Sequence, residues 1–251
     1  MKIALLSDIH ANLPALQACL AHARAHGADQ LAFLGDMVGY GGQPAQVLDL
    51  IMAEVERGAW AIQGNHDAMA LHPPPHPSTM GEEGAAWTHQ QLSSAHLDFL
   101  RQLPVQQIYG SLLLVHASAY EPAAWHYISD NVQAERSIHA AHALNDGIRY
   151  IFCGHVHQQS LYYHTPTAKL MRFVPQPGVT IPVPQHRHWL AIVGSCGQPR
   201  DGDTRAMYAL YDEALATLTF HRVDYDCAAA AAAVRTTPLP EFFALRLELG
   251  Q

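Results

Sequence analysis

The amino-acid sequence predicts an α/β protein, and three observations support this prediction. Over the first 63 residues, apolar runs of strand length alternate with segments whose apolar residues recur at helical spacing, as in a parallel sheet. Later in the chain, short β-rich runs are separated by turns, which is typical of antiparallel strands. Hydrophobic residues make up 49% of the 251 residues and charged residues 14%, so neither disorder nor a membrane span is expected. We predict a single domain over residues 1–251.

The first 63 residues are predicted to form a strand–helix–strand–helix–strand unit. Residues 2–7 are an apolar run, and Asn12 then caps a helix that Gly27 closes. The rest of the unit is a strand at 30–35, a helix that ends at Gly58 and a strand at 59–63. Such a unit places its strands parallel in one sheet.

Beyond this unit the elements become more varied. Residues 71–77, with the sequence LHPPPHP, are expected to form a stiff loop because proline donates no backbone hydrogen bond. The elements predicted after the loop are a helix at 82–101, a strand at 108–116, a helix at 132–144, a strand at 149–154 and, after the antiparallel strands, a short helical segment of about 226–250.

Charge and cysteine content exclude several classes of protein. The formal net charge is −8, and the sequence contains no run of Lys or Arg residues. Polymer nucleic acid is therefore not an expected partner, because its binding usually needs a basic surface. The four cysteines lack a C-x-x-C spacing, which favours reduced, buried thiols. The N-terminus lacks an export signal, so we expect a cytoplasmic protein that does not bind membranes. Histidine is unusually abundant, since the 18 histidines outnumber all Lys and Arg together.

Polar residues able to bind metals stand where the predicted strands end. The carboxyl edge of a parallel sheet is where ligands usually bind, because several loops meet there. The residues at these positions are Asp8, His10, Asp36, Asn65, His66, His116, His155 and His157. We expect their carboxylate, carboxamide and imidazole groups to converge on one site.

The order of these residues resembles a known motif series. Asp8-x-His10, Gly35-Asp36, Gly64-Asn65-His66-Asp67, His116 and Gly154-His155-x-His157 are similar to the motifs of the calcineurin-like metallophosphoesterases. The segments GDMVGYG, GSCGQPRDGD and LPEFFALRL extend the resemblance over nearly the whole chain, towards the small prokaryotic phosphodiesterase branch. The resemblance implies a four-layer α/β/β/α sandwich with two mixed sheets.

The resemblance to the calcineurin-like metallophosphoesterases also implies a pair of metal ions. Asp8, His10 and His157 would bind one ion, Asn65, His116 and His155 the second, and Asp36 would bridge the two. Oxygen and nitrogen ligands without sulfur suit two divalent ions of Mn, Fe, Zn or Ni, among which we favour Mn. A water held between two such ions ionises near neutral pH and gives a hydroxide nucleophile.

Several further residues are candidates for catalysis or for substrate binding. The resemblance assigns His66 to protonation of the leaving oxygen or to stabilisation of the transition state, with Asp67 orienting its imidazole. Arg200 is a candidate substrate contact because a guanidinium matches phosphate, although pairing with Asp201 or Asp203 is equally open. Two further candidate substrate contacts are Asn12 and His76. For Asn12 the favoured role is that of helix cap, and His76 lies in the proline loop. Cys196 is expected to pack in the core. Other histidines, such as His22, are expected on the surface.

We therefore predict a metal-dependent phosphoester hydrolase, more specifically a phosphodiesterase for a small nucleotide-type substrate. One alternative is a phosphomonoesterase or protein phosphatase, which the same ligands could serve. The other is a metal-binding interaction scaffold, against which the intact His66 argues. The sequence does not specify the physiological substrate, the native metals or the oligomeric state.

Overall fold

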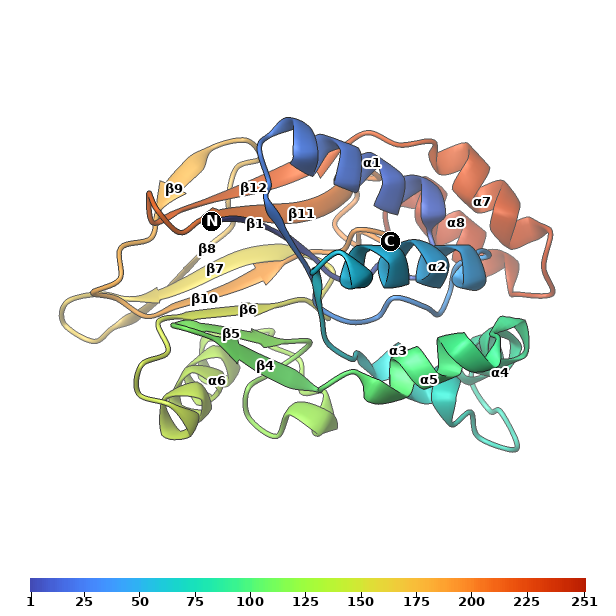
Figure 1. Ribbon diagram of the computed structural model, residues 1–251, viewed down its shortest axis with the longest axis horizontal. Helices are drawn as coiled ribbons and strands as arrows, with labels where there is room; N and C mark the ends of the chain where they lie inside the picture. Colours follow the sequence, from blue (N-terminus) through green and yellow to red (C-terminus); the bar gives the residue numbers. More distant parts are fainter.

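Two six-stranded mixed sheets lie face to face in the computed structural model, which describes all 251 residues (Figure 1). The first sheet has the order β3 (Trp60–Ala61), β2 (Gln30–Phe33), β1 (Lys2–Leu6), β11 (Ala206–Asp212), β12 (Thr217–Val223) and β9 (Thr180–Pro182). The second has the order β4 (Gln106–Tyr109), β5 (Leu112–Val115), β6 (Tyr150–Cys153), β10 (Trp189–Val193), β7 (Gln159–His164) and β8 (Leu170–Phe173). Strands β1, β2 and β3 are parallel, as are β5, β6 and β10, and the other pairings are antiparallel.

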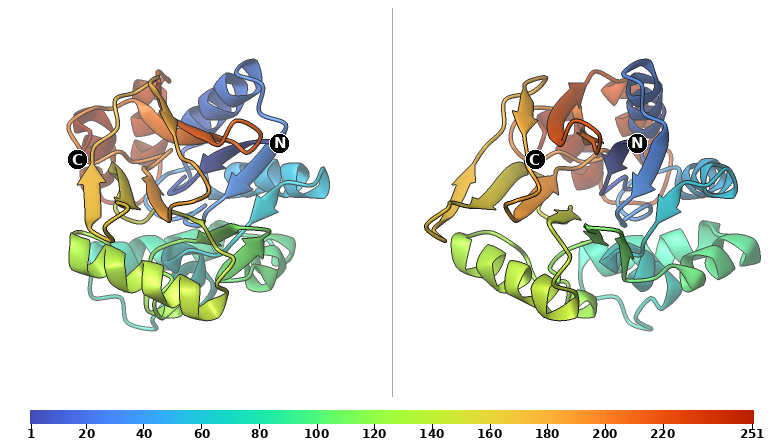
Figure 2. Two further views of the ribbon diagram at one scale, coloured as in Figure 1. Left: turned by 90° about the vertical axis from the view of Figure 1, so that its left-hand side faces the viewer. Right: turned by 60° about the vertical axis from the view of Figure 1, so that its left-hand side comes forward.

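Helices form the outer layers on both sides of the two sheets (Figures 1 and 2). The first sheet is covered by α1 (Leu13–Ala25) and α2 (Pro44–Glu56), and α7 (Cys227–Arg235) and α8 (Glu241–Leu249) pack together beside α1. The second sheet is covered by α6 (Asn131–Leu144), which a short 3₁₀ turn at Pro122–Ala124 precedes. Between β3 and β4 the chain forms α3 (Asn65–Leu71), α4 (Met80–Gln91) and α5 (Ser94–Gln102). This arrangement confirms the predicted four-layer sandwich, and none of its helices is both long and apolar enough to cross a membrane.

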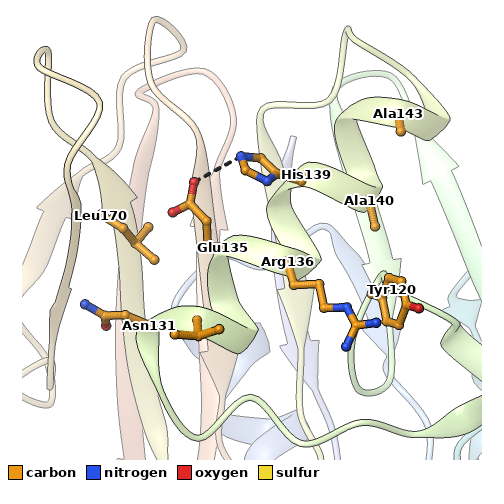
Figure 3. Close-up of a pocket in the computed structure, with 9 residues that line it drawn as sticks. Tyr120, Asn131, Glu135, Arg136, His139, Ala140, Ala143 and Leu170 are labelled. Atoms are coloured by element: carbon orange, nitrogen blue, oxygen red, sulfur yellow. Dashed lines mark ion pairs between the residues drawn. The ribbon is translucent and has the colours of Figure 1, made fainter.

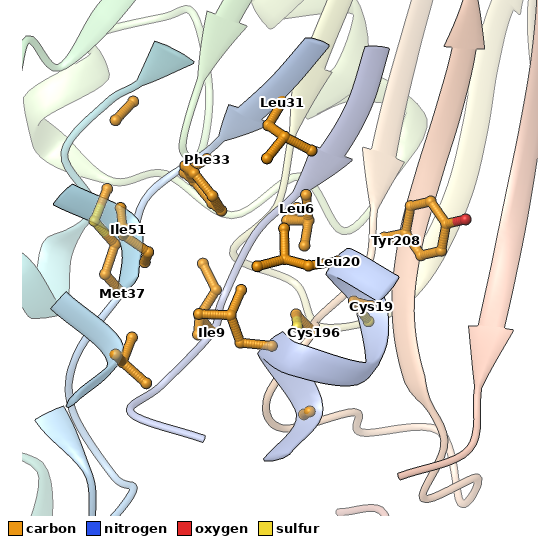
Figure 4. Packing of buried hydrophobic residues seen from close by; sticks show 14 of the residues in the cluster. Leu6, Ile9, Cys19, Leu20, Leu31, Phe33, Met37, Ile51, Cys196 and Tyr208 are labelled. Carbon is orange, nitrogen blue, oxygen red and sulfur yellow. The ribbon is translucent and has the colours of Figure 1, made fainter. Parts of the chain in front are cut away.

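The alternation of side chains along β1 shows how the layers are held together. Ile3 and Leu5 belong to the cluster between the two sheets, whereas Ala4 and Leu6 belong to the cluster under α1 and α2. Successive residues of a strand point to opposite faces, so a strand with helices on one side and a sheet on the other is apolar throughout. Figure 4 shows the helix side of this core, where Cys196 packs near Cys19. The expectation that Cys196 is a packing residue is confirmed.

Several predicted elements differ in the structure, each for a local reason. The single helix expected at 82–101 is wrong: α4 ends at Gln91, and a new helix begins because the Ser93 hydroxyl accepts a hydrogen bond from the His96 amide at 3.2 Å. The strand expected at 108–116 is also wrong, since Gly110 has a φ of +58° and turns the chain into the β4–β5 hairpin. Helix α3 and strand β9 were not predicted.

Candidate metal centre

The parallel strands of both sheets deliver the predicted ligands to one edge of the molecule. Asp8 and His10 follow β1, Asp36 follows β2, Asn65 opens α3, His116 follows β5, and His155 and His157 follow β6. Their side chains form two adjacent groups that could each hold a metal ion, with ligand atoms within 4.8 Å of one another in each group. The members are Asp8, His10 and His157 in the first group and Asp36, His116 and His155 in the second.

Asp36 and Asn65 complete this arrangement. One oxygen of Asp36, Oδ2, lies 3.2 Å from His116 Nε2 and 3.8 Å from His10 Nε2, so the carboxylate stands between the two groups. Its other oxygen accepts a hydrogen bond from the His66 amide at 2.7 Å. Asn65 Oδ1 lies 3.2 Å from His116 Nε2 and adds an oxygen donor to the second group.

Hydrogen bonds to backbone carbonyl oxygens fix the orientation of three histidine rings. His10, His116 and His157 each place Nδ1 against a carbonyl oxygen, of Val38 at 3.2 Å, Leu34 at 2.7 Å and Gln198 at 2.6 Å. A neutral imidazole that donates from Nδ1 presents the lone pair of Nε2, so the free lone pairs of these rings point into the site. His10 Nε2 and His157 Nε2 are only 3.1 Å apart, and two facing lone pairs repel unless a cation lies between them. This donor set therefore fits divalent metal ions.

The ligand loops adopt backbone conformations that side chains rarely take. Positive φ angles occur at Asp8 (53°), His10 (48°), Asp36 (53°), His155 (66°) and His157 (61°). Left-handed backbone at non-glycine residues is uncommon and is often found at functional sites. Each turn therefore sets the direction of a ligand by sharply reversing the chain just after a buried strand.

Glycine at position 154 makes room for the first carboxylate. A Cβ atom added there would overlap Ser7 Oγ and Asp8 Oδ2, and Asp8 Oδ2 also accepts a hydrogen bond from the His155 amide at 2.9 Å. The motif glycine is thus required because two ligand loops, one from each sheet, touch at this point.

Buried charges in the site shift one another's ionisation. Burial raises the pKa of Asp8 and Asp36, but the imidazoles of His157 and His116 outweigh it and hold both pKa values below their ordinary range. Burial lowers the pKa of His116, but Asp36 beside it raises that pKa to about 10. Burial lowers the pKa of His155 to about 4, and the nearby His116 adds to this effect.

His66 lies beside this cluster without being one of its donors. Its ring centroid is 5.1 Å from that of His10 and 4.3 Å from that of Tyr40, and its side chain is 7% exposed. Its Nδ1 atom has no hydrogen-bond partner, and burial lowers the pKa of its imidazole.

The expectation that Asp67 directly orients the His66 imidazole is wrong. The Asp67 carboxylate instead accepts hydrogen bonds from the amides of Met37 at 2.9 Å, Val38 at 3.2 Å and Gly64 at 2.9 Å. As the third residue of α3, Asp67 points back towards the start of its helix. It therefore ties the loop after β2 to the loop after β3. Burial, with a smaller contribution from Asp36, raises its pKa to about 7.

The predicted substrate contacts separate in the structure. The Asn12 amide is fully used, since Oδ1 accepts from the Ala15 amide at 3.1 Å and Nδ2 donates to the Gly197 carbonyl at 2.8 Å. The substrate role for Asn12 is therefore wrong, and its role as helix cap is confirmed. His76 is exposed and makes no hydrogen bond, ion pair or ring contact with the metal centre. No geometric observation supports it as a substrate contact.

Arg200 does lie at the site. Its backbone amide donates to the His157 carbonyl at 3.2 Å, and its guanidinium lies 5.6 Å from the centre of the Tyr40 ring. The alternative of an ion pair with Asp201 or Asp203 is wrong, because Arg222 binds Asp201 and Arg205 binds Asp203 at 2.7 Å.

Other residues around the centre were not identified from the sequence. Tyr127 stacks on His155 with ring centroids 3.9 Å apart, and Gln198 acts through its backbone carbonyl. Neither has a pattern that singles it out. His22, expected on the surface, is half-buried there, where it is hydrogen-bonded to the Tyr208 hydroxyl at 2.7 Å and stacks on His26.

The largest surface depression, of about 740 Å³, lies over α6 and contains none of the metal-binding groups. Figure 3 shows it, with Glu135 paired to His139 at 3.1 Å and the Arg136 guanidinium over the Tyr120 ring. Its lining is mainly apolar. Size alone therefore does not locate the chemistry in this protein.

The protein thus has two mixed sheets between helical layers, with a candidate metal centre of imidazole and carboxylate donors where the parallel strands end. Residues 1–214 match the calcineurin-like phosphoesterase superfamily domain, and the chain belongs to this superfamily of phosphoesterases.

Individual relatives extend the match to the whole chain. The uncharacterized protein MJ0912 of Methanocaldococcus jannaschii is 30% identical over 99% of this chain and 98% of its own length. A metallophosphoesterase from Sphaerobacter thermophilus is 33% identical, with a TM-score of 0.86 over 100% of this chain and 99% of that one. The hypothetical protein PH1004 from Pyrococcus horikoshii shares the fold at 18% identity, with a TM-score of 0.76 over 100% and 98% of the two chains.

Proposed function

We propose that this protein is a dinuclear-metal-dependent phosphodiesterase for a small nucleotide-type substrate. The observation that carries the proposal is the orientation of the histidine rings. Three imidazoles fixed through Nδ1 aim their Nε2 atoms at two adjacent positions, and Asp36 stands between those positions. Ligand alignment alone would also suit a metal-binding scaffold, and what argues for catalysis is His66, which lies beside the donor set with an unpartnered Nδ1 atom.

Asp8, His10 and His157 would hold one ion, Asn65, His116 and His155 the other, and Asp36 both. Two divalent cations, for which we favour manganese over iron, zinc or nickel, would supply Lewis acidity and an ionised water as nucleophile. A shared carboxylate reduces repulsion between two cations held close together, which accounts for the buried position of Asp36 between the groups.

The role of His66 in this proposal is to act on the leaving group. His66 lies next to the donor set without belonging to it. Its neighbour in the chain, Asn65, offers Oδ1 to the second metal group, and Asp36 accepts a hydrogen bond from the His66 backbone amide. The Tyr40 ring and Gly39 enclose it, and a Cβ at Gly39 would approach His66 Nδ1 to 2.7 Å. Held in this way, the imidazole could donate a proton to the departing oxygen or stabilise its charge.

The experiment that tests the proposal compares matched aryl esters. Turnover of bis(p-nitrophenyl) phosphate and of p-nitrophenyl phosphate is measured with Mn²⁺, Fe²⁺, Zn²⁺ and Ni²⁺. We expect a higher kcat/KM for the diester and full dependence on added metal. The exposed loop histidine variant His72→Asn serves as a control that removes an imidazole away from the donor set. A tenfold preference for the monoester would replace this proposal with a phosphomonoesterase, and no turnover with any metal would favour a scaffold.

The proposal includes the setting in which the enzyme works. It takes residues 1–251 as one functional domain, because α7 packs against α1 and the Gly202 amide bonds the Gly250 carbonyl at 2.9 Å. A cytoplasmic location is supported by the four cysteines, which are all free thiols. The net charge of −8 argues against polymer nucleic acid as substrate.

A further inference from the structure

Two arginines near the metal centre lie close together without an acidic partner. Arg200 donates to Gln198 Oε1 from Nη2 at 2.7 Å and from Nε at 3.3 Å, and Arg246 Nη1 lies 3.5 Å from the same oxygen. Arg246 belongs to α8, where its guanidinium covers the Phe242 ring at 4.5 Å and its Nε atom is buried without a hydrogen-bond partner. Burial lowers the pKa of Arg246, and the neighbouring charge of Arg200 lowers it further.

This pair differs from the ion-paired arginines of the molecule. Arg222, Arg205 and Arg235 each bind a carboxylate, and Arg222 and Arg205 take the two acidic residues that follow Arg200 in sequence. Two like charges that share one neutral amide oxygen repel each other and gain no compensating ion pair. Such an arrangement is stabilised when an anion binds between the two guanidinium groups.

Gln198 connects the arginine pair directly to the metal centre. Its backbone carbonyl accepts from His157 Nδ1 at 2.6 Å, while its side-chain oxygen holds the arginines. The Tyr40 ring is near both Arg200 and the candidate ligand His10, at 5.6 Å from the guanidinium carbon and 4.7 Å from the His10 ring centroid. The Arg200 guanidinium is therefore close to the metal centre, and an anion bound by the two arginines would lie beside that centre.

We propose that Arg200 and Arg246 form a subsite for a second phosphate, adjacent to the phosphate that is cleaved. This inference rests on the proposed function and narrows it to phosphoesters that carry a neighbouring phosphate, such as nucleoside or dinucleoside polyphosphates. Two guanidinium groups offer donors in planar forks that match the several oxygens of a phosphate.

The test measures binding of two non-hydrolysable anions to the manganese-loaded protein by isothermal titration calorimetry. Methylphosphonate presents one phosphonate, and methylenebisphosphonate presents two. The measured quantity is the ratio of their dissociation constants at one fixed free Mn²⁺ concentration, so that chelation by the bisphosphonate is the same for every variant. We expect the wild-type protein to favour the bisphosphonate by tenfold or more.

Charge-removing variants then locate this preference. Arg200→Gln and Arg246→Gln should each reduce the ratio by about tenfold, the scale of one charged hydrogen bond. Arg172→Gln is the matched control, because Arg172 also lies 5.6 Å from a tyrosine ring, that of Tyr162, but on edge strand β8. It should leave the ratio unchanged. Arg246→Lys keeps the positive charge, so it should reduce the ratio of dissociation constants less than Arg246→Gln does. It also tests the role of Arg246 if the glutamine variant folds poorly.

A ratio that stays at the wild-type value in both glutamine variants would overturn the inference. If the affinities for both anions have then fallen equally, the arginines contact the scissile phosphoryl group itself; if neither affinity has changed, the arginines bind no phosphate. Turnover of bis(p-nitrophenyl) phosphate, which has no second phosphate, reports separately on the proposed function, so failure of one is distinguishable from failure of the other.

Discussion

Replacing Asp36 with asparagine tests the two-metal assignment most directly. In Asp36→Asn the side-chain oxygen can keep the hydrogen bond from the His66 amide, and the new NH₂ group can donate to His116 Nε2, which lies 3.2 Å from the present carboxylate oxygen. The variant should therefore fold. What it loses is one negative charge within about 4 Å of each divalent cation, which is worth about 8 kcal/mol per cation at an effective dielectric constant of 20. That energy corresponds to about a millionfold in metal affinity.

The assay is elemental analysis after dialysis against metal-free buffer, together with turnover of bis(p-nitrophenyl) phosphate. Asp36→Asn should retain at most one metal per chain and lose activity. Asp49→Asn removes the same charge from an exposed carboxylate that contacts His96 at 2.8 Å, and it should retain the metal content of the wild type. A variant that keeps two metals and normal turnover would refute the bridging role of Asp36.

Three further predictions concern the leaving group, the fit of the ligand loops and the response to acid. His66→Asn should keep both metals while turnover falls by about 10²- to 10⁴-fold, and the loss should shrink for nitrophenolate leaving groups; equal losses across leaving groups would make His66 a charge stabiliser. Gly154→Ala should lose bound metal because its methyl group overlaps Ser7, whereas Gly81→Ala, whose nearest neighbouring atom is 3.9 Å away, should keep it; metal retention in both would contradict the close packing. Burial lowers the pKa of His221 from 6.5 to about 4. Between these two pH values the unfolded chain binds a proton that the native protein does not. The free energy of unfolding therefore has its full value above pH 6.5 and decreases as the pH falls towards 4. Urea unfolding should show that the wild type loses about 2 kcal/mol more than His221→Phe between pH 7.5 and 4.5; equal losses would show that His221 titrates normally.

The sequence was sufficient to predict which residues meet at the candidate metal centre, because most of them follow a buried strand. Asp8 and His116 come directly after apolar runs, and parallel strands must bring such positions to one edge. The same reasoning fails where the direction of a side chain depends on backbone geometry. Asp67 follows His66 in the chain, but its position in the first turn of α3 turns its carboxylate towards backbone amides.

Elements and contacts set by distant or single residues were also beyond prediction. One serine at position 93 divides an apparent long helix, and Gly110 turns an apparent long strand. Arg246 joins Arg200 only because α8 returns to the site, and no local spacing indicates this return. Long-range packing of this kind has no periodic signal in the chain.

The position of β1 between β2 and β11 has a consequence for synthesis of the protein on the ribosome. Ligands Asp8 and His10 emerge early, but the loop that carries them is held by amides translated far later, since Cys196 donates to the Ser7 carbonyl at 2.8 Å and Gly197 to that of Asp8 at 2.9 Å. A nascent chain that ends before this segment has the first ligands without the loop that fixes them. Contacts between such distant parts of a chain also form slowly. We therefore expect truncated translation products to be inactive, and catalytic competence to arise only after most of the polypeptide has left the ribosome.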